Sequence, residues 1–245
     1  AGALVDAESL AFLEILRESS NDATILLLVN YRADHQSKPL RNITELRIDP
    51  LPAASAGELL DGLIGSRAEL GPIKQALMNT TEGNPLFLEE SVRSLIESGV
   101  LVGEPGQLRL RGSLPPGFVP KTIQALLAAR IDRLRPETKE MLQCAAVIGT
   151  DVPRALLEAM AGVPQSEIER GTRELLSADF LYEKTLFPEI AYAFRHAMTR
   201  EVAYAGLLRE QKTALHARAA DAMIALADGR IDEYVERIAL HAEQG

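Results

Sequence analysis

The segment "ATILLLVNYR" constrains the fold of this chain more than any other, because its apolar residues are consecutive. No polar residue interrupts the run from Ile25 to Val29, and polar residues bound it on both sides. A strand with one solvated face alternates apolar and polar residues, whereas a strand buried on both faces does not. The run therefore predicts a strand inside a parallel sheet.

A second strand is predicted for "ITELRI", residues 43–48, which ends where Pro50 forbids continuation. A helix through Leu10, Leu13, Ile15 and Leu16, which ends near the polar residues from Ser19 to Asp22, precedes both segments. Two strands are too few to form a stable sheet in water. We therefore expect the remaining strands to lie upstream of Ala1, and the opening residues, which lack a methionine, read as a cut end.

The rest of the chain reads as helices with two β hairpins. Gly and Pro residues separate the segments, and three helices followed by a hairpin is the order of a winged helix-turn-helix unit. Predicted helices lie within residues 55–66 (Ser55 as N-cap and Glu58 completing a capping box), 70–83, 85–98, 121–134, 137–148, 154–161, 166–178 and most of 196–244. Predicted hairpins cover residues 100–110 and 180–194.

Composition narrows the class of protein. With 245 residues, of which 47% are hydrophobic, the chain is long enough for more than one core. The formal net charge of −9 argues against a nucleic-acid or anionic-membrane binder. The single cysteine, Cys144, excludes an internal disulfide and favours a reducing, cytoplasmic compartment. No apolar stretch approaches the roughly 20 residues of a membrane span.

The stretch "TEGNPLFLEE" places Gly, Asn and Pro directly before an amphipathic helix. Gly83 suits a helix stop, Asn84 an N-cap, and Pro85 the first helical position. On the following helix, Leu88, Val92, Leu95 and Ile96 share one face at helical spacing. Capping alone explains these three residues, and it does not exclude a contact with a ligand.

Several strings follow one another in a fixed order, among them "AESLAFLEIL", "ILLLVNYR", "TEGNPLFLEESVRSLIESGVLV", "VPKTIQALLAARIDRL" and "FRHAMTREVAY". In this order the chain resembles the bacterial STAND-type (AAA-related) regulatory ATPases, of the kind that follow a class III adenylate or guanylate cyclase domain. The resemblance extends over essentially all 245 residues. It implies a fragment that begins just after the Walker B strand.

The resemblance implies a mostly α fold with a small α/β remnant, organised in four parts. Residues 1–52 resemble the end of the parallel sheet of a P-loop NTPase, and residues 53–116 a helical lid that contains the GNP motif. Residues 117–195 resemble a winged-helix domain, and residues 196–245 the start of a tetratricopeptide-like helical-repeat arm.

The resemblance also implies that the intact parent protein binds ATP and Mg²⁺. Arg32 would then sense the terminal phosphate, with Asn30 as a weaker candidate, and the Gly83-Asn84-Pro85 turn would place Pro85 against the adenine. No G-x-x-x-x-G-K-[ST] motif occurs in this chain. We therefore expect these residues alone to bind no cofactor and to hydrolyse no ATP.

The implied partners are an upstream NTPase core and an output domain of the same polypeptide, and a protein bound by the helical repeats. Two other functions stay open: a winged-helix DNA-binding transcriptional regulator, and a helical interaction scaffold. The third helix of the winged-helix segment carries Arg170 and Arg173 beside Glu167, Glu169 and Glu174. Because this acidic surface would repel phosphates, we expect no nucleic-acid partner and an intramolecular packing role.

Other chemically suggestive residues have structural explanations. His196 and Glu201 are five residues apart, a spacing that does not suit two metal ligands on one helix face. Glu89 and Glu90 are expected to interact with the dipole of their helix, and Cys144 to lie in the core. The sequence predicts no catalytic residue and no metal site.

A chain that lacks part of its sheet should associate with itself. We expect the isolated 245-residue chain to expose the flank of Ile25–Val29 and to aggregate as its concentration rises. Size-exclusion chromatography with light scattering measures this. A monodisperse chain that unfolds in one cooperative transition would contradict the missing sheet.

Overall fold

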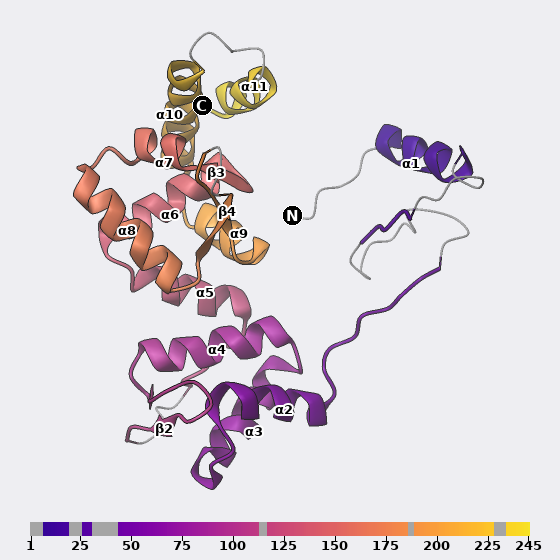
Figure 1. Ribbon diagram of the computed structural model, residues 1–245, viewed down its shortest axis with the longest axis vertical. Helices are drawn as coiled ribbons and strands as arrows, with labels where there is room; N and C mark the ends of the chain where they lie inside the picture. Colours follow the sequence, from indigo (N-terminus) through magenta and orange to yellow (C-terminus); the bar gives the residue numbers. More distant parts are fainter. Residues whose placement is uncertain (1–6, 20–25, 31–43, 113–116, 186–188, 228–233) are drawn as a thin grey trace. The chain divides into compact units, whose positions relative to one another are not determined.

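The computed structural model describes residues 7–19, 26–30, 44–112, 117–185, 189–227 and 234–245. The chain divides into two compact units, Ala1–Asp49 and Pro50–Gly245, called unit 1 and unit 2 below. The described residues are mostly helical with a few short antiparallel strands, so the predicted fold class is confirmed in this coarse form. Figure 1 shows the elements of each unit.

Unit 1 contains helix α1 (Ala7–Ser19), as predicted, and two segments without regular structure. Residues 26–30 and 44–49 form neither helix nor strand, so the two predicted strands are wrong for the described part of each segment. Several of their apolar side chains are exposed: Leu28 is 87% and Ile48 is 90% accessible. A strand forms only when its backbone pairs with a neighbour, and the described residues of unit 1 pair in no sheet.

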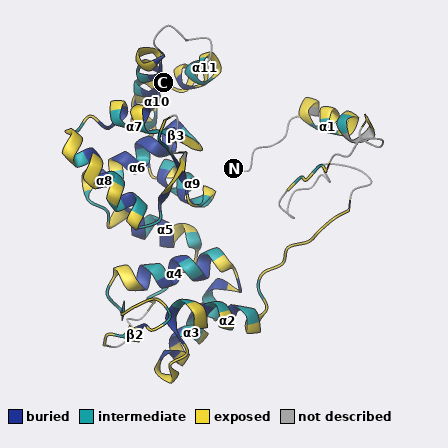
Figure 2. Ribbon diagram, viewed as in Figure 1, coloured by how far each residue is buried: buried dark blue, intermediate teal, exposed yellow. Residues whose placement is uncertain are grey.

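The first half of unit 2 is a small helical layer closed by a hairpin. It comprises α2 (Ala53–Ile64), a 3₁₀ turn (Ala68–Leu70), α3 (Gly71–Thr81), α4 (Pro85–Glu97), β1 (Leu101–Val102) and β2 (Arg109–Leu110). The strands pair antiparallel, which confirms the predicted hairpin. The inward faces of the helices share one apolar core, which includes Leu60, Ile73, Leu77, Leu88 and Leu101. Figure 2 shows these buried faces in dark blue.

Two details of the predicted helices are wrong. Helix α2 starts at Ala53 with Pro52 as N-cap, so Ser55 lies inside its first turn instead of capping it. The fixed φ of proline is already suited to a helix start, which explains the earlier beginning. On α4, Leu88, Val92 and Leu95 are buried as expected, but Ile96 is 43% exposed.

The second half of unit 2 is a three-stranded sheet packed with helices. It comprises α5 (Ile123–Asp132), α6 (Pro136–Ile148), β3 (Asp151–Pro153), α7 (Arg154–Ala161), α8 (Gln165–Ser177), β4 (Leu181–Thr185) and β5 (Ala191–Phe194). The antiparallel order is β3-β5-β4, so the predicted hairpin β4–β5 is confirmed. Strand β3 was not predicted, because it is too short to show an alternation of apolar and polar residues. Its central Val152 is buried in the core of this half.

The described residues of unit 2 also form α9 (Ala197–Ala205), α10 (Arg209–Leu226) and α11 (Val235–Gln244). Helices α10 and α11 contact each other closely, and α10 also packs on α6 and α7. No helix among the described residues is long and apolar enough to cross a membrane.

Two buried histidines join α10 to α11. His216 Nδ1 lies 2.8 Å from His241 Nδ1, and His216 Nε2 lies 3.0 Å from the Tyr204 hydroxyl on α9. Burial lowers the pKa of His216, with a contribution from Arg200. Burial, the neighbouring His216 and Arg237 lower the pKa of His241 to about 4.

The histidine pair makes the packing of α11 dependent on pH. The unfolded chain binds protons near pH 6.5, whereas the folded pair resists them, so stability is full above that pH and falls towards pH 4. Native-state hydrogen exchange of α11, corrected for the intrinsic exchange rate, should show this decline. The His216→Gln/His241→Gln double variant should flatten it. Equal protection at pH 7.5 and 4.5 in the unmodified protein would contradict the prediction.

Candidate functional site

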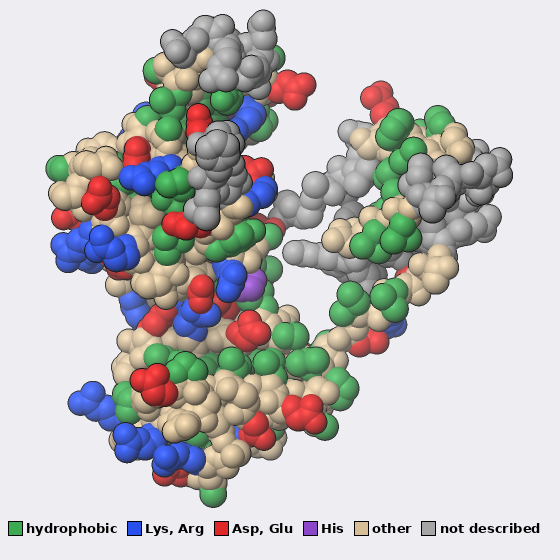
Figure 3. Space-filling model, viewed as in Figure 1, with side chains coloured by type: hydrophobic (Ala, Val, Ile, Leu, Met, Phe, Trp, Pro, Cys, Tyr) green, Lys and Arg blue, Asp and Glu red, His purple; other side chains and the backbone are tan. Residues whose placement is uncertain are grey.

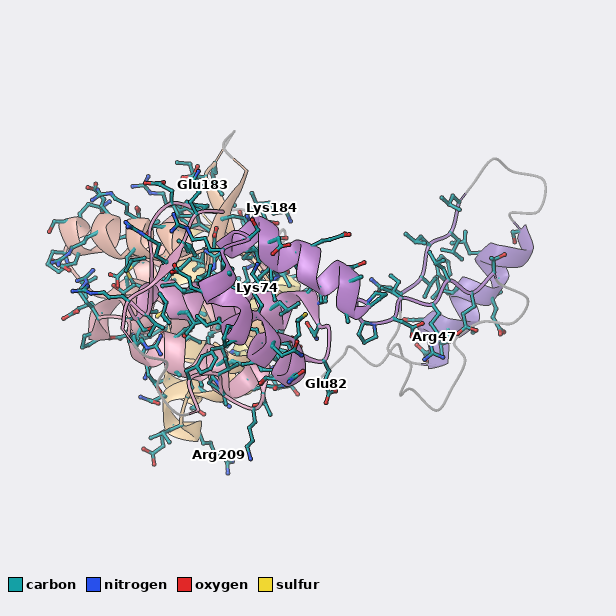
Figure 4. The ribbon with its side chains drawn as sticks, turned by 90° about the horizontal axis from the view of Figure 1, so that it is seen from below. Arg47, Lys74, Glu82, Glu183, Lys184 and Arg209 are labelled. Carbon is teal, nitrogen blue, oxygen red and sulfur yellow. The ribbon has the colours of Figure 1, made fainter. Side chains whose placement is uncertain are left out.

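The predicted turn lies between α3 and α4 of unit 2. Helix α3 ends at Thr81, and Glu82 then adopts a left-handed conformation with φ 50°. Gly83 follows with φ 76°, so the left-handed region begins one residue earlier than a stop at glycine alone would place it. Glu82 projects from the surface of unit 2 (Figure 4).

The turn ends in the predicted cap of α4. The Asn84 side-chain oxygen accepts a hydrogen bond from the Phe87 backbone N–H at 3.1 Å, and Pro85 occupies the first turn of the helix. The capping roles of Asn84 and Pro85 are therefore confirmed. Both residues are exposed, whereas Gly83 is buried.

Gly83 is buried because the backbone of Leu51 packs directly on it. The Leu51 N–H donates to the Gly83 carbonyl at 2.9 Å. A Cβ added to Gly83 would clash with the Leu51 carbonyl oxygen, so only glycine allows this approach. Leu51 follows Asp49, the last residue of unit 1, by two positions. The turn is thus fastened to the start of unit 2.

Helix α4 leads from this turn to a buried ion cluster. The cluster contains Glu90, Arg93 and Glu97 of α4, Arg130 of α5, and Asp179 after α8. The 13 residues of α4 span about 18 Å at the usual helical rise. One rigid helix therefore begins at the exposed turn and contributes side chains to the cluster between Glu90 and its last residue, Glu97.

Arg130 is the centre of the cluster and is only 1% exposed. Its guanidinium pairs with Glu90 and Glu97, and it donates to the Ala178 carbonyl at 2.9 Å. The Phe180 ring lies against the same group, 4.6 Å from the guanidinium carbon to the ring centroid. Bonds to two carboxylates and one carbonyl satisfy a charge that burial would otherwise make very costly.

The cluster is a source of specificity more than of net stability. Removing water from an ion pair offsets most of its attraction, but removal of one partner strands the other and costs about 3–5 kcal/mol. Glu90 is itself only 2% exposed, so it depends on Arg130 in this way. The cluster therefore defines one arrangement of α4, α5 and the end of α8.

Further polar contacts surround Arg130. Arg93 pairs with Asp179, whose carboxylate also lies 3.9 Å from Arg195. Arg133 donates to the Ser94 hydroxyl at 3.0 Å. Figure 3 shows acidic and basic side chains interspersed at the level where the two halves of unit 2 meet.

A cleft of about 700 Å³ runs beside the cluster. Its walls come from α4, the β1–β2 hairpin, the α5–α6 connection and the end of α8. The lining includes apolar Val92, Ile96 and Phe180 together with Arg93 and Arg133. The exposure of Ile96 on α4 is explained by its place on this cleft.

The other predicted site residues are placed as follows. Arg32 lies outside the described residues, and Asn30 is an exposed residue of unit 1. Glu90 does not serve the helix dipole alone, as the sequence analysis expected, because it binds Arg130. His196 lies at the corner where β5 meets α9. Cys144 is buried in the core as predicted, and burial raises the pKa of its thiol to about 11.

The acidic residues of α8 are partly used inside unit 2. Arg135 donates to Glu167 and to Glu174, each at 3.0 Å, and these bonds raise its pKa, that to Glu167 most strongly. Arg170 is exposed and 3.7 Å from Glu167. The charges of α8 therefore bind a neighbouring helix start and offer little attraction to phosphates.

The role of Arg130 in the ion cluster was not predicted, although the sequence contains a signal for it. Arg130 follows Leu126 by four residues and Leu127 by three, so it shares the buried face of α5 with them. A charged residue on the apolar face of a helix requires a partner. The acidic residues of α4 at helical spacing were the matching half of this signal.

Among the described residues, no group of three or more His, Cys, Asp or Glu side chains converges to hold a metal ion. The candidate site therefore consists of the turn, the ion cluster and the cleft.

Comparison with known proteins gives one informative relative. No protein-family model matches the chain. A protein of Rhizobium meliloti (strain 1021), named Uncharacterized protein R02095, is 29% identical over 231 residues, which cover 89% of this chain. The match covers 22% of the relative, so the chain spans about a fifth of the length of the curated protein it matches.

The close approach of Leu51 to Gly83 predicts a large effect of one methyl group. Gly83→Ala should lower the free energy of unfolding by about 1–3 kcal/mol, because alanine strains the positive φ and meets the Leu51 carbonyl. Urea unfolding measures the change. Gly57→Ala on α2, where a Cβ meets nothing within 4 Å, is the matched control and should be neutral or stabilising. Equal stabilities for the two variants would contradict the tight turn.

Proposed function

We propose that this chain is the lid, the winged-helix domain and the first arm segment of a STAND-type regulatory ATPase that switches an attached output domain, such as a nucleotide cyclase. The observation that carries the proposal is the Gly83-Asn84-Pro85 turn, which is fastened to Leu51 and exposes Pro85. A proline offers a rigid apolar ring with no N–H, which suits contact with an adenine face.

The proposed ATP site is shared between this chain and the rest of the full-length protein. In the proposal, the exposed Pro85 contacts the adenine. The phosphate cradle and the Mg²⁺ ligands belong to an NTPase core of the same polypeptide, with Arg32 as the sensor of the terminal phosphate. The bound nucleotide would supply the difference in binding energy that separates the two states of the switch.

The exposed apolar residues of unit 1 support this division. Leu26 and Leu28, in the segment read as a buried strand, are accessible by 89% and 87%. Contiguous apolar residues left in solvent mark a surface that another element covers. In the proposal, another element of the full-length protein covers them, and Arg32 follows this segment in the sequence.

Helix α4 connects the two ends of the proposed switch. Its first turn contains Pro85, and it binds Arg130 through Glu90 near its middle and Glu97 at its end. A displacement of the turn by nucleotide would move the whole helix, because a helix of this length is rigid. The movement would then reach the winged-helix domain at the ion cluster.

The wider architecture is proposed on the same basis. The relative is several times longer than this chain, which supports a role as one segment of a multidomain protein. Helices α10 and α11 would begin a helical-repeat arm that binds a protein partner. The lone buried Cys144 supports a cytoplasmic location, where thiols stay reduced.

Nucleotide binding by the full-length gene product tests the proposal. Mg²⁺–ATP should raise its melting temperature, and Pro85→Ala should weaken ATP binding about 3- to 10-fold through loss of an apolar contact of about 1 kcal/mol. Arg32→Ala should reduce the preference for ATP over ADP.

Pro72→Ala is the matched control, because Pro72 occupies the first turn of α3 outside the proposed site. It should leave nucleotide affinity unchanged. A full-length protein that binds no adenine nucleotide, or equal effects of the Pro85 and Pro72 variants, would refute the proposal.

A further inference from the structure

Unit 2 contains two apolar cores that share no residue. One core lies among α2, α3, α4 and the β1–β2 hairpin, and the other among α6 to α11 and the three-stranded sheet. Helix α5 packs against α4 on one side and α9 on the other (Figure 1). Each half therefore has its own source of stability, as independent domains do.

The junction between the halves contains charged groups beside the buried Leu126 and Leu127 of α5. Glu90, Arg93 and Glu97 on α4 meet Arg130 of α5 and Asp179 at the end of α8. Interfaces of this polar kind are typical of parts that move relative to each other, whereas permanent contacts are more apolar. The ion pairs give this junction one preferred geometry and a small set of bonds to break.

The backbone conformation of Asp179 supports a functional role for its side chain. Among the described residues, only Glu82 and Asp179 are non-glycine residues with positive φ, and Asp179 has φ 55°. It follows α8 at a position where glycine is the usual residue, because left-handed backbone strains a side chain. An aspartate there supplies a carboxylate to Arg93 that glycine could not.

The two strained residues are both connected to helix α4. Glu82 precedes the turn that starts α4, and Asp179 receives Arg93 from the second half of α4. Strain of this kind persists where surrounding contacts over-determine the backbone, and it clusters at switch regions. Helix α4 thus has a strained connection at its start and a strained partner along its second half.

We propose that the Arg130-centred ion cluster is a latch, which holds the two halves of unit 2 together and releases them by rotation about α5 when its pairs break. In the present structure the latch is closed. The cleft beside it gives water access to Arg93 and Glu97, so the pairs can exchange with solvent without unfolding either core. The use of the latch as a nucleotide-driven switch rests on the proposed function, whereas its mechanics do not.

Distance measurements on the whole chain without nucleotide test the latch. Spin labels at Glu69→Cys, beside α3, and Ser166→Cys, on α8, report the separation of the halves, because both sites are exposed. The native Cys144 is buried and should remain unlabelled. Double electron–electron resonance should give one short distance for the otherwise unmodified protein.

Variants of the latch should add a second, longer distance. Asp179→Asn keeps a residue that tolerates left-handed backbone but removes the charge, and it should raise the open population about tenfold, a typical coupling between paired residues. Arg93→Gln should act similarly, and the double variant should add little to either. Arg130→Met, which removes the central charge, should open the junction most.

The control breaks an ion pair elsewhere with the same substitution. Asp151 pairs with Lys184 at the surface of the three-stranded sheet, and Asp151→Asn should leave the distance unchanged. A distance distribution for Asp179→Asn identical to that of Asp151→Asn would overturn the latch, and so would additive effects of Arg93→Gln and Asp179→Asn. If Arg130→Met fails to fold, these two variants still decide.

The outcome is separable from nucleotide binding. Opening on loss of the latch in a protein whose full-length form binds no ATP would support the latch and refute the proposed function. The reverse result, ATP binding with a junction that ignores every latch variant, would refute the latch alone.

Discussion

The arrangement of unit 2 depends on the contacts of the buried Arg130 guanidinium. It links helix α4 through Glu90 and Glu97 to the end of α8 through the Ala178 carbonyl. The two apolar cores share no residue, so packing within each core makes no demand on the orientation of the other. Water-excluded charges do make such a demand, because no other geometry satisfies them.

The same helix that meets Arg130 begins at an exposed, rigid turn. Gly83 allows the Leu51 backbone to approach, Asn84 caps the helix, and Pro85 faces solvent. In the proposed switch, the ligand contact at Pro85 and the ion cluster at Arg130 would be joined by one rigid helix. This connection explains how a small change at a ligand could alter the position of a whole domain without deforming either core.

Local signals in the sequence predicted local structure well. The cap at Asn84, the proline start of α4 and both hairpins follow from backbone chemistry that acts over a few residues. The strand predicted at Ile25–Val29 failed in its described part because a strand depends on partners that the segment cannot specify. The ion cluster was missed because it joins residues up to 86 positions apart, between Arg93 and Asp179. Only the position of Arg130 on an apolar helix face hinted at it.

We expect the turn at Pro85 to contact adenine in the full-length protein. Photo-crosslinking with 8-azido-ATP, followed by mass spectrometry of the peptides, tests it most directly. We expect labelling of the peptide that contains Gly83 to Phe87. Excess ATP should suppress this labelling, and Pro85→Ala should weaken it. Saturable labelling that maps elsewhere and leaves this peptide unmodified would contradict it.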